Sequence, residues 1–330
     1  MQHVINILLL VTGFLFLVKG ADFFVASSAS IARRFRISSL VIGLTLVAFG
    51  TSLPELAVSF IAALSVGPGE TADIAMGNVV GSNIANIALI LGLTAITRPV
   101  IVSKTMYGKE FPYLVLSTLL LIVFAFLFQA DPSIVLWEAL VLLVVFAGYI
   151  ILMVRTSKEA HVEEDFKVMD MRRSILLVII GIAGVTAGGW MVTTGAENIA
   201  TDLLVQIFGV DRSKAVTLVG LSVVAIGTSL PEMVTSVVAA RKGENEIAFG
   251  NLVGSNIFNM LFILGLSGTV TPIFINADVL SDLWIMFAVT VFAVGAAITF
   301  GRVSKKEGWT LVIVYIIYMA FIIIRALALF

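Results

Sequence analysis

The same six residues occur twice in this chain, and both copies lie inside apolar runs. Gly-Thr-Ser-Leu-Pro-Glu occupies positions 50–55 and again positions 227–232. A second pair of segments, residues 77–86 and 250–259, follows the two copies and agrees at eight of ten positions. The chain is therefore an internal duplication. Both copies place hydroxyls, amides and one carboxylate in surroundings that are otherwise apolar.

The composition places this duplication in a membrane. Hydrophobic residues make up 60% of the chain and charged residues only 12%, whereas about 25% of a soluble domain is charged. The net charge of −1 provides no basic surface for nucleic acid. The chain has no cysteine, and its two histidines are His3 and His161. Thiolate and imidazole chemistry inside the membrane is therefore excluded.

Ten apolar runs are long enough to cross a bilayer, which takes about 20 residues. They cover residues 4–31, 38–64, 72–97, 111–129, 133–154, 174–201, 214–240, 246–271, 279–300 and 308–328. We expect an all-α integral membrane protein with ten transmembrane helices. Residues 1–154 and 174–330 would each hold five of them, and residues 155–173 would form a polar linker. The first run lacks the basic start and cleavage site of a signal peptide, so we interpret it as a span.

Basic residues in the loops predict the orientation. Sixteen lysines and arginines lie in the loops after the odd-numbered spans, and three lie on the other side. Both termini should therefore be outside and the linker cytoplasmic. Because each half has an odd number of spans, the second half starts on the opposite side from the first. Such inverted repeats are typical of transporters, which bind their substrates near the midplane.

A single glutamate stands in the middle of each of two spans. Glu55 is the only charge between Leu40 and Leu64, and Glu232 is the only charge between Ala215 and Ala240. An ionisable group at this depth costs at least about 2.5 kcal/mol and is functional by default. The alternative is a protonated glutamate that hydrogen-bonds a neighbouring helix. We favour a cation site because the carboxylate recurs in an identical setting.

A proline precedes each glutamate. Pro54 and Pro231 lack the N–H that would bond the carbonyls of Gly50 and Gly227. Both spans should therefore bend beside the glutamate and free carbonyl oxygens, which are tolerated at this depth only toward protein or a wet cavity. A simple kink for helix packing is the alternative, and it is less favoured because both kinks adjoin a buried acid.

Polar stripes on the third and eighth spans predict the other wall of the site. Asn78, Ser82 and Asn86 fall on one helix face, and the same spacing recurs in the second half at residues 251, 255 and 259. Hydrogen bonding between helices is a real competing interpretation for any one of these residues. Asn83 and Asn256 lie off the stripe and are assigned to packing or capping.

Together the two halves offer carboxylate, hydroxyl, amide and carbonyl oxygens, without a nitrogen or sulfur ligand. Flexible all-oxygen sites suit Ca²⁺, whereas Mg²⁺ demands a tighter octahedron. Two carboxylates balance one Ca²⁺, two monovalent cations or two protons. A site that either ion can neutralise, but not both at once, meets the requirement of an exchanger.

These paired motifs resemble the α-repeats of sodium/calcium exchangers of the prokaryotic type, within the calcium/cation antiporter superfamily. The resemblance covers nearly the whole chain. It implies ten transmembrane helices, a cluster of ion sites between helices 2, 3, 7 and 8, and long helices 1 and 6 that slide. Some members, including the potassium-dependent branch, carry Asp where this chain has Asn259. The asparagine argues against potassium co-transport.

The resemblance also implies the residues that bind the ions. Those carried over are Glu55, Glu232, Thr51, Ser52, Thr228, Ser229, Ser82, Ser255, Asn86 and Asn259, with the backbone carbonyls of Ala48 and Ala225.

The expected function is a secondary antiporter in the cell membrane that exchanges Na⁺ for Ca²⁺ by alternating access, without a cofactor. The partners expected are these ions, or H⁺ in place of Na⁺ in the alternative below, and the lipid bilayer. The oligomeric state is left open, and a monomer is compatible with the sequence. A Ca²⁺/H⁺ antiporter with the same carboxylates is the nearest alternative. A cation channel is an alternative of another class, for which kinked inverted repeats are an unusual design. An enzyme is not expected, because no His, Cys or activated Ser is placed for catalysis.

Overall fold

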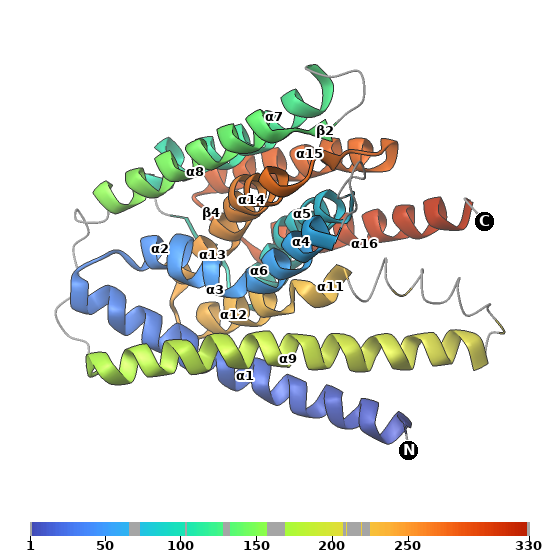
Figure 1. Cartoon of the computed structure of the whole chain (residues 1–330). Helices are drawn as coiled ribbons and strands as arrows, with labels where there is room; N and C mark the ends of the chain where they lie inside the picture. The colour runs from blue at the N-terminus through green and yellow to red at the C-terminus, as the bar shows by residue number, and fades with distance from the viewer. Residues whose placement is uncertain are drawn as a thin grey trace.

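Long apolar helices make up most of the computed structural model (Figure 1). It describes residues 2–65, 73–102, 104–127, 133–156, 169–206, 209, 219 and 225–328. Within them, eight helices are long and apolar enough to cross a membrane. A further pair of helices, residues 39–51 and 53–65, passes the same test together but is bent by 51°. The expectation of a multi-pass helical membrane protein is confirmed.

The N-terminal half begins with α1 (Gln2–Phe35) and continues into a bent span made of several short helices. The parts of that span are α2 (Ser39–Ile42), the π-helix η1 (Gly43–Val47), α3 (Ala48–Thr51) and α4 (Leu53–Ser65). The next span comprises α5 (Asp73–Ile84), the π-helix η2 (Ala85–Ile90) and α6 (Leu91–Thr97). The 3-10 helix η3 (Lys104–Gly108), α7 (Glu110–Leu127) and α8 (Leu136–Thr156) follow.

The C-terminal half repeats this order as far as it is described. It starts with α9 (Met171–Gln206), followed by α11 (Ala225–Thr228) and α12 (Leu230–Arg241). The next span contains α13 (Asn245–Ile257), the π-helix η6 (Phe258–Ile263) and α14 (Leu264–Val270). The last helices are α15 (Ala277–Phe300) and α16 (Lys305–Ala328). Most of the linker predicted at 155–173 and the start of the span predicted at 214–240 lie outside the described residues.

Two short β-ribbons connect the halves. The strand β1 (Val100–Ile101) pairs antiparallel with β4 (Arg302–Val303), and β2 (Ser133–Ile134) pairs with β3 (Ile273–Phe274). In each ribbon, one strand directly follows the polar-stripe span of one half. The other strand directly precedes the last helix of the other half. The two ribbons are therefore equivalent when the halves are exchanged.

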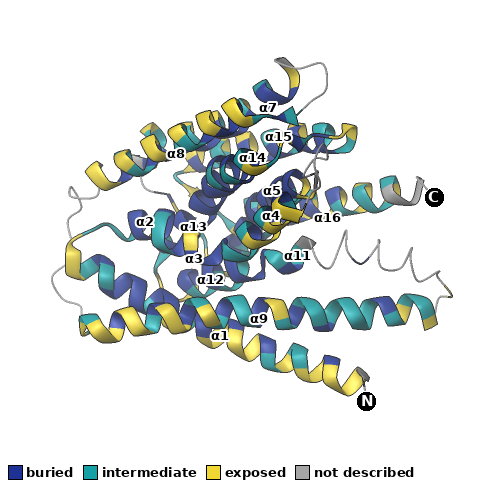
Figure 2. Cartoon of the chain, viewed as in Figure 1, coloured by how far each residue is buried: buried dark blue, intermediate teal, exposed yellow. Residues whose placement is uncertain are grey.

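Burial separates central helices from peripheral ones (Figure 2). We compared the 18 most apolar consecutive residues of each helix. In the helix at 245–270, 94% of them are buried, and in the helix at 74–97, 78% are buried. In α1, α8 and α16 only 28% are buried. The peripheral helices present apolar side chains outward, as lipid-facing helices do. The two spans that carry the polar stripes thus form the centre of the molecule.

The long helices α1 and α9 lie side by side along one edge of the molecule (Figure 1). A helix of 36 residues such as α9 is about 54 Å long, well beyond the roughly 30 Å of a hydrocarbon core. Glycines let the two backbones meet: a Cβ on Gly20 would lie 2.7 Å from the Val185 nitrogen, and one on Gly188 would lie 2.6 Å from the Leu17 nitrogen. The contact therefore presents few projecting side chains.

Candidate functional site

Both glutamate-bearing spans break one residue after the repeated threonine. Ser52 has φ −84° and ψ 11° at the end of α3, and Ser229 has φ −88° and ψ 6° at the start of α12. This backbone region is sparsely populated and common at functional sites. Pro54 lies in the first turn of α4, where a missing N–H is tolerated. The predicted break is confirmed in both halves, and it places a helix N-terminus just before each glutamate.

Glu55 and Glu232 occupy the first turns of α4 and α12. Both are 0% exposed. Neither forms a salt bridge with a basic group among the described residues. The two carboxylates repel one another electrostatically. Two acids buried together without a basic partner would be strongly unfavourable unless a cation or a proton neutralised them.

The two halves bond each other's glutamate. Ser52 Oγ donates to Glu232 Oε1 at 2.8 Å, and Ser229 Oγ donates to Glu55 Oε1 at 3.4 Å. The order Ser-Leu-Pro-Glu would permit a capping box within each helix. Instead, the Ser229 side chain makes no cap hydrogen bond to its own helix. The Oε2 atom of each glutamate has no hydrogen-bond partner, so one oxygen on each acid is available to a ligand.

Further hydroxyls surround the two acids. Ser82 interacts with the Glu55 carboxylate, and Thr51 and Ser255 interact with that of Glu232. Thr51 Oγ1 also lies 3.0 Å from Asn251 Oδ1, whereas Ser255 Oγ has no well-formed hydrogen bond. Thr51 and Ser255 are 0% exposed and Ser82 is 2% exposed. Thr228 ends α11, directly before the break at Ser229.

The first asparagine of each stripe supports the site from behind. Asn78 Nδ2 donates to the Glu55 carbonyl at 3.2 Å and to Ser59 Oγ at 3.0 Å. Asn251 Nδ2 donates to Ser236 Oγ at 3.0 Å. These amides connect the polar-stripe spans to the broken spans. For Asn78 and Asn251, the alternative interpretation of the polar stripe, hydrogen bonding between helices, therefore holds.

Four asparagines interlock where α5–η2 meets α13–η6. Asn259 Nδ2 donates to Asn83 Oδ1 at 3.1 Å, and Asn83 Nδ2 donates to the Asn256 carbonyl at 3.3 Å. Asn86 Nδ2 donates to Asn256 Oδ1 at 3.3 Å. The Oδ1 atoms of Asn86 and Asn259 have no partner. The off-stripe Asn83 and Asn256 thus orient the two asparagines whose oxygens remain free.

The π-helices at these positions could not be predicted from the stripe spacing. η2 and η6 begin at Ala85 and Phe258, so that Asn86 and Asn259 are their second residues. A π-helical turn is rare and often marks a functional site. No pattern of residue types predicts where a helix widens into a π-helical turn. The sequence signal that could have raised suspicion was the recurrence of Ser-Asn-Ile-x-Asn in both halves.

The two predicted carbonyl ligands differ in what the structure records. The Ala48 carbonyl accepts the Ser52 N–H at 3.0 Å and Thr51 Oγ1 at 3.3 Å. Ala225 begins α11, and the nearby Ser229 N–H donates to the Ile226 carbonyl at 3.2 Å. The Ala48 carbonyl therefore already accepts hydrogen bonds from two protein donors.

The site brings together carboxylate, hydroxyl and amide oxygens from α3, α4, α12, α5 and α13. No three His, Asp or Glu side chains gather anywhere in the described part of the chain. Two carboxylates with neutral oxygens are the ligand chemistry of hard cations in flexible geometry rather than of transition metals. Because the acids come from different halves, any movement between the halves would alter the ligand set.

Comparison with known proteins agrees with this chemistry. The profile of the family described as "Sodium/calcium exchanger protein" matches residues 5–155 and 173–324. The sodium/calcium exchanger MaX1 of Methanosarcina acetivorans is 31% identical over 97% of this chain and 98% of its own length. The inner membrane protein YrbG of Escherichia coli is 35% identical over 80% of this chain and 79% of its own length.

Solved structures show the same fold. A structure of the sodium-calcium exchanger NCX_Mj soaked with Na⁺ and Sr²⁺ superposes with a TM-score of 0.80 at 30% sequence identity. The match covers 96% of this chain and 99% of that one.

Proposed function

This chain belongs to the sodium/calcium exchanger family, and on that premise we propose that it exchanges Na⁺ for Ca²⁺ as a secondary antiporter. The family consists of transporters rather than enzymes, and it moves these ions without a cofactor. The proposal concerns what this chain itself transports and how.

One observation carries the proposal. Glu55 and Glu232 are fully buried, come from different halves, and are bonded crosswise by Ser229 and Ser52. Two carboxylates held together in this way compensate the charge of one Ca²⁺. Two Na⁺ neutralise the same pair, so binding of one ion excludes the other electrostatically.

The proposed ligands are the residues implied by the family motif. Glu55 and Glu232 are shared by the transported ions. The remaining oxygens come from Thr51, Ser52, Ser82, Thr228, Ser229, Ser255, Asn86, Asn259 and the carbonyls of Ala48 and Ala225. The unpartnered oxygens of both glutamates and of the two asparagines support this choice.

The proposed architecture is ten transmembrane helices in two inverted five-helix repeats, residues 1–154 and 174–330. Matched breaks at Ser52 and Ser229 and matched π-helices η2 and η6 support the repeat. The two β-ribbons, which are equivalent when the halves are interchanged, support the repeat as well. Alternating access would come from sliding of α1 and α9 over the remaining helices as one pair, which the close glycine contact between the two helices holds together.

The proposed orientation has both termini outside and the linker in the cytoplasm, because basic residues concentrate in the loops on one side. The chain has no cysteine, so labelling of a single introduced cysteine shows on which side of the membrane that position lies. An impermeant maleimide added to intact cells should label Gln206→Cys and spare Thr156→Cys. Labelling of Thr156→Cys but not of Gln206→Cys would show that the orientation is the opposite one.

The experiment that tests the function is Ca²⁺ uptake into proteoliposomes loaded with Na⁺. Wild-type protein should take up radioactive Ca²⁺ when Na⁺ is diluted outside, and Glu55→Gln and Glu232→Gln should each abolish the uptake. Each substitution keeps the shape of the side chain and removes one charge. Normal uptake by both variants would rule out the proposed site.

Protons can neutralise the same carboxylates, so a Ca²⁺/H⁺ antiporter is the alternative that the site supports. Uptake that follows an imposed pH gradient and ignores Na⁺ would favour it. Ca²⁺ flux without any counter-ion would instead indicate a channel.

A further inference from the structure

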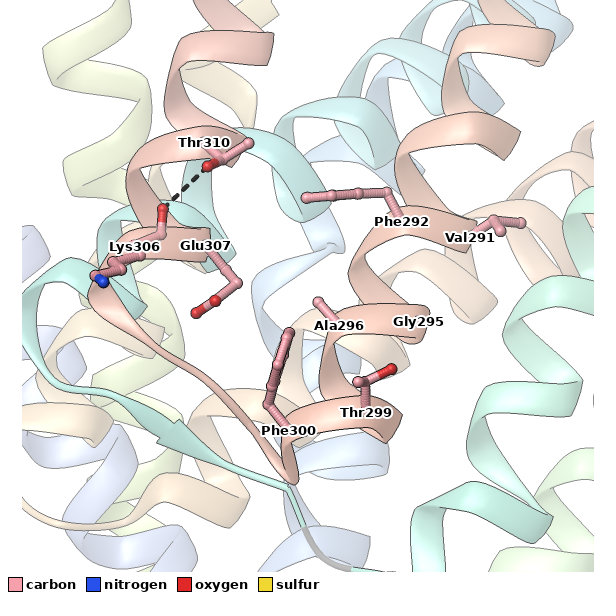
Figure 3. Close-up of a pocket in the computed structure, with 9 residues that line it drawn as sticks. All are labelled: Val291, Phe292, Gly295, Ala296, Thr299, Phe300, Lys306, Glu307 and Thr310. Carbon is pink, nitrogen blue, oxygen red and sulfur yellow. Dashed lines mark hydrogen bonds between the residues drawn. The ribbon is translucent and has the colours of Figure 1, made fainter.

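A groove lies between the last two helices, away from the glutamate pair (Figure 3). Its volume of about 550 Å³ is within the range of about 300–1,000 Å³ typical of small-molecule sites. Figure 3 shows Phe292 and Ala296 of α15 directed toward α16 across this space, and Val291 and Gly295 also line it. Neither helix fills it.

The wall on α15 is apolar and open. Phe292 is 45% exposed, and Phe300, which ends the helix, is 61% exposed. A Cβ on Gly295 would meet no heavy atom within 4 Å. Both helices are long and apolar enough to cross the membrane, so this wall faces the region occupied by acyl chains.

Basic residues gather in the sequence where α16 begins: Lys306 lines the groove, and Arg302 and Lys305 lie within four residues of it. Arg302, Lys305 and Lys306 are all exposed, and none forms a salt bridge with a carboxylate in the described ranges. In Figure 3 the Lys306 ammonium is directed away from Phe292 and Val291. Long basic side chains at helix ends extend in this way to the headgroup layer.

The one acid in the groove is already engaged. The Glu307 carboxylate accepts the Ser304 N–H at 2.9 Å and the Ser304 hydroxyl, and the Lys306 N–H donates to Ser304 Oγ at 3.3 Å. Ser304 and Glu307 thus form the capping box that starts α16. Three cations against one acid leave the rim, residues 302–306 where α16 begins, positive.

We propose that this groove binds one anionic phospholipid, with an acyl chain along α15 and the phosphate at the Arg302, Lys305 and Lys306 rim. An apolar wall within the span and a positive rim at its end match both parts of such a lipid, and basic pockets between membrane helices are a known mode of headgroup binding. A soluble phosphate would use only the rim, and a zwitterionic lipid would gain little from three cations. The assignment is independent of the transported ion.

The test is lipid binding to the purified full-length protein by native mass spectrometry. The probes are dioleoylphosphatidylglycerol and dioleoylphosphatidylcholine, titrated separately onto delipidated protein. Wild-type protein should bind one phosphatidylglycerol more tightly than phosphatidylcholine. Lys306→Ala should weaken that binding about fivefold, the ratio that corresponds to about 1 kcal/mol for one basic residue at an anionic surface.

Gly295→Leu should weaken phosphatidylglycerol binding to a similar extent, because it places a side chain in the groove at a position where an added Cβ meets no atom within 4 Å. The matched controls are Arg155→Ala at the exposed end of α8 and Gly148→Leu, also exposed on α8, where the nearest atom is 4.0 Å away. Both should bind like wild type. Thermal unfolding of all four variants verifies that they fold.

Three results would overturn the proposal. Equal affinity for the two lipids would remove the charge selectivity. A loss with Lys306→Ala but none with Gly295→Leu would indicate a surface charge effect without a groove. Displacement of the lipid by millimolar glycerol 3-phosphate would assign the rim to a soluble phosphate.

Discussion

Two serines make equivalent contacts of unequal length at the centre of the molecule. Ser52 Oγ is 2.8 Å from the Glu232 carboxylate, and Ser229 Oγ is 3.4 Å from that of Glu55. A hydrogen bond to a charged group contributes about 1.5–3 kcal/mol and weakens as it lengthens. The halves are repeated in sequence, yet their contributions to ion binding should differ.

We predict that Ser52→Ala raises the KM for Ca²⁺ about tenfold, equivalent to about 1.4 kcal/mol, and that Ser229→Ala raises it less than about threefold. The measurement is the concentration dependence of Na⁺-driven Ca²⁺ uptake. Ser117→Ala is the control, since Ser117 is buried in α7 and its hydroxyl donates to the nearby Tyr113 carbonyl of the same helix. Equal effects of the two site variants would contradict the asymmetry.

Residue types predicted the members of the site better than their partners. A lone glutamate at mid-span has few explanations, so Glu55 and Glu232 were identified from sequence, and the structure brings them together. Their crosswise bonds to Ser229 and Ser52 depend on how two distant segments pack. Asn83 and Asn256 were assigned to packing or capping, and their hydrogen bonds between facing helices agree with packing. Which partners they bond could not be predicted, because spacing on one helix says nothing of the facing helix.

Broken helices are the elements on which the site depends, and they were only partly predictable. A proline beside glycine and serine signals a break because it removes a backbone donor, and the 51° bend follows that signal. The turns η2 and η6 carry no such signal. Equivalent glycines of the two halves also differ in their surroundings: a Cβ on Gly250 would lie 2.8 Å from the Leu40 carbonyl, whereas at Gly77 no described atom lies within 4 Å.

The long helix α1 is fastened by ion pairs to the turn between α12 and α13. Lys242 Nζ lies 3.0 Å from Asp22 Oδ1 and donates to the Asp22 carbonyl at 2.9 Å. Arg33 pairs with Glu244 in the same region. If α1 slides during transport, as we propose, these contacts must break in one of the access states.

We predict that Lys242→Ala increases the maximal rate of exchange about two- to threefold, because partly exposed ion pairs contribute up to about 1 kcal/mol. The KM for Ca²⁺ should stay unchanged, since neither Lys242 nor Asp22 is part of the glutamate site. The rate at saturating Ca²⁺ is the measurement. The exchanged pair Asp22→Lys with Lys242→Asp should restore the wild-type rate, and a persistently altered rate in that variant would argue against a direct pairing.

At the scale of the whole molecule, the duplication determines where the site lies. Hydropathy and the repeat predicted the helices, and loop charges predicted the orientation that we propose. The sequence predicted a site between helices of both halves, but it could not predict the individual contacts that join them, the β-ribbons and the Ser–Glu hydrogen bonds. These contacts join residues up to about 200 positions apart, and only packing selects such partners. One site shared by both halves is the consequence.

The most direct test of this shared site is equilibrium binding of radioactive Ca²⁺ to the purified protein without Na⁺. Wild-type protein should saturate with one Ca²⁺ at the glutamate pair, and excess Na⁺ should displace it. Glu55→Gln and Glu232→Gln should each lose that ion completely, because either substitution leaves a single buried charge. Retention of wild-type Ca²⁺ binding by either single variant would show that the halves bind Ca²⁺ separately and would contradict the account.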